Sequence, residues 1–127
     1  KNISIIPKVP KNNVQDLLNI CDLAYFSTVR VENWNSGQSL NKIIDYMYAA
    51  KPILATYSGF PSMINESGCG EFIPHEGKIK IEQKFIEYSN MPKSELLEMG
   101  AKGKEWLIKN RTYSLLADKY LDLIKNM

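Results

Sequence analysis

Apolar residues along this chain alternate between two spacings, which divide most of it into short strands and helices. Short runs with apolar residues lie at positions 3–6, 23–27, 53–56 and 70–74, the first of them rich in branched residues, and such runs are typical of strands. Apolar residues spaced for one helical face predict helices around Val14 to Cys21, from Leu40 to Met47, between Pro61 and Gly68, and at 79–88, 94–110 and 113–125. Asn12 or Asn13 is placed to cap the first of these, and Gly68 to end the short one.

Strands and helices alternate from residue 3 to about residue 90. This order predicts an α/β fold with a parallel sheet of about four strands, helices on both faces and a helical C-terminal third. No linker or repeat divides the chain, so we expect one domain over residues 1–127. The chain does not begin with Met and opens on a predicted strand, so we expect it to be a piece of a longer protein.

Composition narrows the classes of partner and site. The net charge of +2 is too small for strong electrostatic attraction to nucleic acid, so we expect no nucleic-acid partner. Cys21 and Cys69 lack metal-ligand spacing, and no metal is expected. No apolar run could span a membrane and no secretory signal is present, so we expect no transmembrane segment and a cytoplasmic protein.

The predicted ligand site follows the second strand. Loops after parallel strands converge at one edge of the sheet, and residues 28–38 form a connection longer than the usual 2 to 6 or so residues. Gly37 would allow a close approach of the backbone to a ligand, and Ser39 would cap the next helix and leave amides free for an anion. Gln38, Asn41, Lys42 and Asp45 then form a polar face, on which Lys42 suits a phosphate and Asp45 a pair of hydroxyls. A solvated face of an ordinary amphipathic helix is the alternative.

The stretch SLNKIIDYMYAAKPILA, residues 39–55, resembles the donor-site signature of family 4 glycosyltransferases, the bacterial group 1 type. The similarity continues through Met63–Glu66, Gly68–Pro74 and Met99–Gly100. The resemblance implies the Rossmann-like, carboxyl-terminal donor domain of a GT-B enzyme, with the amino-terminal acceptor domain and the first donor-domain strands absent. It implies a nucleoside-diphosphate sugar as donor and a glycan or lipid-linked acceptor, as in the synthesis of capsule, lipopolysaccharide or other cell-surface polysaccharide. The full-length enzyme could then lie against the inner face of the membrane.

Family members carry two glutamates with seven residues between them. The second, which binds the ribose hydroxyls, corresponds to Asp45, and the first falls on Gly37, so Glu32 is the candidate replacement. The resemblance implies retaining transfer without a metal or other cofactor, with Lys42 and the Ser39 turn stabilising the leaving diphosphate. We assign no catalytic residue to this chain and expect it to be inactive in isolation.

Several residues leave alternatives open. Ser58 and Gly59 are candidates for further donor contacts or a simple turn. Trp34 could stack on a ligand or pack the long loop, His75 is interpreted as a surface residue, and Trp106, Tyr113 and Tyr120 as core. The competing functions are a non-catalytic binding or interaction module and a fragment of a sugar-nucleotide epimerase.

Overall fold

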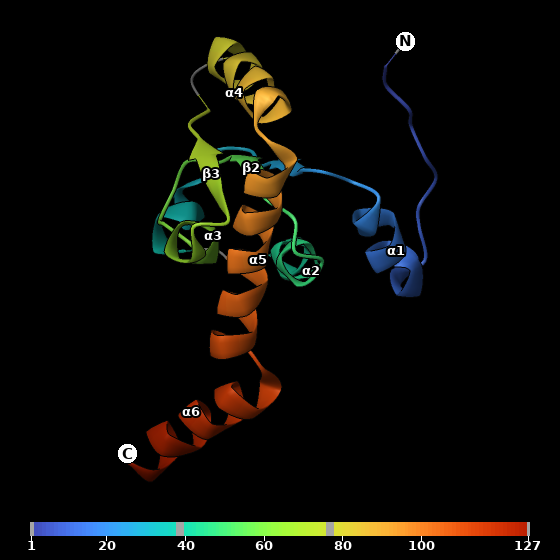
Figure 1. Ribbon diagram of the computed structural model, residues 1–127. Helices are drawn as coiled ribbons and strands as arrows, with labels where there is room; N and C mark the ends of the chain where they lie inside the picture. Colours follow the sequence, from blue (N-terminus) through green and yellow to red (C-terminus); the bar gives the residue numbers. More distant parts are fainter. Residues whose placement is uncertain (1, 38–39, 76–77, 127) are drawn as a thin grey trace.

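The fold comes from a computed structural model that describes residues 2–37, 40–75 and 78–126 (Figure 1). In chain order the elements are η1 (Lys11–Asn13), α1 (Val14–Asn19), β1 (Ala24–Ser27), η2 (Glu32–Ser36), α2 (Asn41–Tyr48), β2 (Ile53–Thr56), α3 (Met63–Ser67), β3 (Gly70–Ile73), α4 (Lys78–Asn90), α5 (Lys93–Asn110) and α6 (Tyr113–Lys125). Strands and helices alternate as far as α4, and the chain is helical after that. The predicted α/β class and helical C-terminal third are confirmed.

The sheet is parallel, with its strands in the order β1-β2-β3. Ala24 pairs with Ile53, and Ile53 pairs with Gly70, so the three strands run in step and end together. Every residue of the central strand β2 is buried. The loops that leave the three carboxyl ends therefore meet at one edge of the sheet, which is where a ligand site is expected in such folds.

The prediction of a strand at residues 3–6 was wrong, so the sheet has three strands rather than about four. Ile3 and Ile5 are 80% and 96% exposed, and the segment runs beside α1, away from the sheet (Figure 1). Branched residues favour extended backbone, but a strand forms only where a neighbouring strand supplies hydrogen-bond partners. Residues 2–10 lie too far from the sheet for that pairing.

Helices cover both faces of the sheet, as predicted. On one face Ala24, Phe26, Ile53 and Ala55 pack against buried residues of α2, α3 and α5. On the other face Leu54 and Ile73 pack with Tyr88 of α4 and with residues near the start of α5. Successive side chains of a strand point to opposite faces, so β2 contributes to both cores.

Two glycines let α5 pack closely against the turn that follows α2 and against the residue that precedes β3. A Cβ on Gly100 would lie 1.9 Å from the carbonyl oxygen of Ala50, and a Cβ on Gly103 would lie 2.7 Å from the Cβ of Cys69. Ala50 follows α2 with a φ of 53° and is the one non-glycine residue in the described part of the chain with positive φ. The amides of Ala50 and Lys51 donate back to the carbonyls at positions 47 and 46, which closes the helix in a Schellman turn.

α3 ends at Gly68, as predicted, and begins at a capping box that was not predicted from the sequence. The Ser62 hydroxyl accepts a hydrogen bond from the Ile64 amide, and the Asn65 side chain accepts one from the Ser62 amide, forming a capping box. Gly68 ends the helix with a φ of 70°, in the left-handed region where glycine carries no Cβ penalty. These caps hold the start of α3 directly after the loop that leaves β2.

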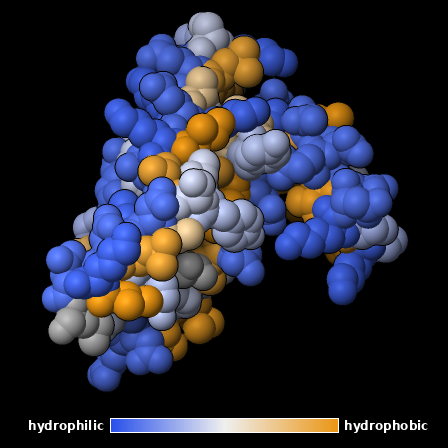
Figure 2. Space-filling model, turned by 90° about the horizontal axis from the view of Figure 1, so that it is seen from below, coloured by the Kyte–Doolittle hydropathy of each residue, from blue (hydrophilic) through white to orange (hydrophobic). Residues whose placement is uncertain are grey.

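α6 adds nothing to either core. Residues 111–126 are all exposed, and α6 extends beyond α5 at an angle to it (Figure 1). The interpretation of Tyr113 and Tyr120 as core residues was wrong, because they are 94% and 67% exposed, whereas Trp106 packs against the first core. Apolar side chains consequently reach the surface among polar ones on the face seen from below (Figure 2). Among the described helices, none combines the length and the hydropathy that a membrane span requires.

Candidate functional site

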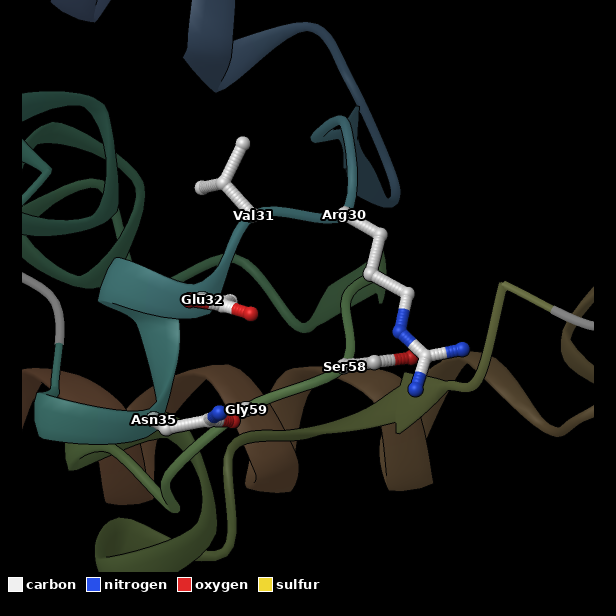
Figure 3. A pocket seen from close by; sticks show the side chains of 6 residues that line it. All are labelled: Arg30, Val31, Glu32, Asn35, Ser58 and Gly59. Carbon is white, nitrogen blue, oxygen red and sulfur yellow. The ribbon is translucent and has the colours of Figure 1, made fainter.

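A pocket of about 550 Å³ opens between the loops that follow β1 and β2. Its lining residues are Arg30, Val31, Glu32 and Asn35 from the first loop and Ser58 and Gly59 from the second (Figure 3). Small-molecule pockets typically measure roughly 300–1,000 Å³ and occur beyond the carboxyl ends of parallel strands. Glu32, Ser58 and Gly59 were candidate donor contacts from the sequence, and the structure brings these three together.

The long loop after β1 is folded back onto the loop after β2, and Trp34 is its anchor. The Trp34 carbonyl accepts hydrogen bonds from the amides of Gly37 and Phe60, at 3.3 and 2.9 Å, and from the Tyr57 hydroxyl at 3.0 Å. The indole N–H donates to the Val29 carbonyl at 2.9 Å, and the indole ring meets the Tyr57 ring edge-on. Of the two alternatives for Trp34, the structure thus shows packing of the loop, and this packing holds the segment whose neighbouring residues line the pocket.

The pocket combines a cation, a carboxylate and neutral polar groups. The Arg30 guanidinium extends toward the loop that carries Ser58, and the Glu32 carboxylate points into the same space from the start of η2 (Figure 3). A guanidinium fits a phosphate with paired hydrogen bonds, and a carboxylate accepts from hydroxyl groups. Sequence reasoning missed Arg30 and Asn35, because only the fold of the loop shows that they face the pocket.

The predicted polar residues of α2 lie apart from this pocket. Asn41 and Lys42 are exposed, and the Lys42 ammonium lies 5.6 Å from the centre of the Phe26 ring. Asp45 is partly buried one turn further on, and its backbone carbonyl accepts a hydrogen bond from the Gln15 side chain. None of these three α2 residues lines the pocket, so the donor-binding set predicted from the sequence falls into two groups.

Gly37 and Leu40 are the described residues of the turn into α2. Leu40 occupies the N-cap position and has no side-chain cap hydrogen bond. Gly37 has a φ of 110°, a conformation that a residue with a Cβ rarely adopts. The predicted contacts of Gln38 and Ser39 lie outside the described residues. Within the described residues, no group of three or more potential metal ligands is found.

His75, interpreted from the sequence as a surface residue, lies at the same edge of the sheet. Its ring is partly buried, with Nδ1 2.9 Å from the Ser58 hydroxyl and Nε2 hydrogen bonded to the Thr28 carbonyl. The His75 amide also donates to the Ser58 oxygen at 3.2 Å. Thr28 follows β1, Ser58 follows β2 and His75 follows β3, so a single side chain connects the ends of all three strands.

Comparison with known proteins gives no relative. No family model matches the chain, and neither the curated proteins nor the solved structures contain a match.

Proposed function

We propose that this chain binds a nucleoside-diphosphate sugar as the donor domain of a glycosyltransferase that builds a glycan or lipid-linked product. The observation that carries the proposal is the pocket at the carboxyl ends of β1 and β2, with Arg30 and Glu32 among its lining residues. A cation beside a carboxylate suits a ligand that has a diphosphate next to a polyhydroxyl group. The resemblance of residues 39–55 to a donor-site signature supports the same ligand class.

In this proposal different charged residues bind different groups of the ligand. Arg30 binds the diphosphate within the pocket, and Lys42 contributes a second positive charge from the first turn of α2. Glu32 and Asp45 accept hydrogen bonds from the hydroxyls of the sugar and the ribose. The chain contributes binding and charge stabilisation of the leaving diphosphate, and the acceptor and its activating groups belong to a further domain.

The experiment is a calorimetric titration of the chain with UDP, GDP, ADP, UDP-glucose and GDP-mannose. Arg30→Gln is compared with Arg111→Gln, because the chain has only these two arginines and Arg111 lies far along the chain, exposed after α5. A charge-assisted hydrogen bond contributes about 1.5–3 kcal/mol, so Arg30→Gln should weaken binding roughly 10- to 150-fold while Arg111→Gln leaves it unchanged. Lys42→Ala and Asp45→Ala, with exposed Lys109→Ala as control, test the second group of residues.

The outcomes separate the candidate functions. Binding that Arg30→Gln and Glu32→Gln weaken supports the donor site, and binding that these variants leave intact places the ligand elsewhere. If no nucleotide binds the folded chain, the proposal fails and a non-catalytic interaction module becomes the better interpretation. Turnover of a sugar nucleotide by the isolated chain at an enzymatic rate would contradict the part of the proposal that places the catalytic groups in another domain.

A further inference from the structure

The hydrogen bonds around His75 determine which of its ring nitrogens carries the proton when the ring is neutral. The Thr28 carbonyl can only accept a hydrogen bond, so Nε2 of His75 must be the donor to it. In a neutral imidazole the other nitrogen is then a bare acceptor. The partner of Nδ1, at 2.9 Å, is the Ser58 hydroxyl, which must therefore donate its hydrogen to the ring.

This arrangement limits what Ser58 can offer to a ligand. A serine hydroxyl has one hydrogen and two acceptor lone pairs. The hydrogen is directed to Nδ1 of His75, and one lone pair accepts the His75 amide at 3.2 Å. Ser58 also lines the pocket, so the remaining lone pair is what it can present there.

We propose that His75 is a positioning residue that fixes Ser58 as a hydrogen-bond acceptor toward the pocket. The ligand group that meets Ser58 is then a donor, a sugar or ribose hydroxyl, and not a phosphate oxygen, which only accepts. The phosphate goes to Arg30 on the opposite loop (Figure 3). The hydrogen-bonding role of Ser58 holds whatever the ligand is, whereas the assignment of ligand groups rests on the proposed function.

The first test needs no ligand, and it is direct because His75 is the only histidine in the sequence. At about pH 8.5, where an ordinary histidine is neutral, the ring nitrogens of the ¹⁵N-labelled chain should give one protonated signal, assigned to Nε2, and one bare signal, assigned to Nδ1. Ser58→Ala should move the Nδ1 signal downfield, because it loses its hydrogen bond, and leave the Nε2 signal in place. A proton on Nδ1, or two averaged signals, would overturn the proposal.

The second test compares two probes, UDP-glucose and pyrophosphate, because pyrophosphate carries a diphosphate group but no sugar or ribose hydroxyl. Ser58→Ala should weaken the binding of UDP-glucose about 2- to 12-fold, which corresponds to the loss of one neutral hydrogen bond, and should leave the affinity for pyrophosphate unchanged. Arg30→Gln should weaken both. Equal weakening of the two probes by Ser58→Ala would show that Ser58 donates to phosphate and would overturn the assignment.

Variants of His75 distinguish positioning from simple support of the loop. His75→Phe keeps a ring but frees the Ser58 hydrogen for a phosphate oxygen, so the preference for UDP-glucose over pyrophosphate should fall. His75→Gln keeps one donor and one acceptor and should restore that preference. If both variants weaken the two probes in parallel, His75 only supports the loop. If the wild-type chain binds neither probe, the proposed function and the ligand assignment both fail, while the ring signals still decide the role of Ser58.

Discussion

The contact between Gly100 and Ala50 allows one prediction to be worked through in numbers. A methyl group at position 100 would lie 1.9 Å from the Ala50 carbonyl oxygen and 2.5 Å from its carbon, whereas real Cβ atoms essentially never approach within 3.0 Å. Both neighbours are backbone atoms of the hydrogen-bonded turn that ends α2. α5 and this turn must therefore move apart in Gly100→Ala.

The expected loss of stability is a difference between two effects. Alanine is favoured over glycine inside a helix by about 1 kcal/mol. Overpacking of a well-packed contact costs about 1–3 kcal/mol, and the upper value applies because no flexible side chain can turn aside. The net loss should be roughly 2 kcal/mol, or a fall of about 6–10 °C in the melting temperature of a chain of this size.

Urea unfolding followed by circular dichroism measures this loss as a lower midpoint at unchanged slope. Ala101→Gly is the matched control, because Ala101 is the next residue of the same helix and is exposed. It isolates the helix-propensity effect and should cost about 1 kcal/mol. A Gly100→Ala variant as stable as the wild type, or more stable, would refute the argument that backbone contact requires glycine here.

Three further predictions concern other buried or strained groups. Ala50→Gly should stabilise the fold by roughly 0.5–1 kcal/mol in the same urea assay, because it relieves the φ of 53° at a position that glycine adopts freely; a loss of stability would contradict this. Burial raises the pKa of the Cys69 thiol, so a thiol reagent should label partly exposed Cys21 first and reach Cys69 only on unfolding, and equal labelling rates would count against a closed core. Burial, with a smaller effect of Glu71, raises the pKa of Tyr88. The neutral Tyr88 hydroxyl therefore contributes fully to stability below about pH 10, and this contribution is lost as the pH rises further. Tyr88→Phe should reduce the alkaline loss of stability, measured as urea midpoints at about pH 8 and 11.

Local signals in the sequence predicted the elements whose causes are local. The bounds of β2 and α6 are those predicted, and α3 lies between Ser62 and Gly68, which supply its caps. The strand at residues 3–6 failed because a strand depends on a neighbour, and a run of branched residues does not show whether that neighbour is present. The prediction that the tyrosines of α6 are core residues was wrong for a related reason, since helical spacing reveals an apolar face but not what covers it.

The sequence indicated where in the fold the candidate site lies, but it did not identify all the residues that line it. The length of the connection after β1 indicated a ligand site at that edge of the sheet, and Glu32, Ser58 and Gly59 line the pocket found there. Arg30 and His75 were missed because their roles depend on segments far apart in the sequence. The Ser58 and His75 side chains, 17 positions apart, meet only because β2 and β3 end in step. The ligand itself and the transferase activity stay predictions.

The exposed helix α6 has a consequence for the kinetics of amide exchange. α6 has 13 residues, all of them exposed, and this length is close to the limit at which an isolated helix persists in water, about 12–15 residues. Its ends are capped only by local hydrogen bonds: the Thr112 hydroxyl accepts from the Leu115 amide at 3.4 Å, and the Asn126 side chain donates to the Asp122 carbonyl at 2.8 Å. Deuterium should therefore enter α6 by local opening, well before it enters β2, whose amides exchange only when the sheet itself opens.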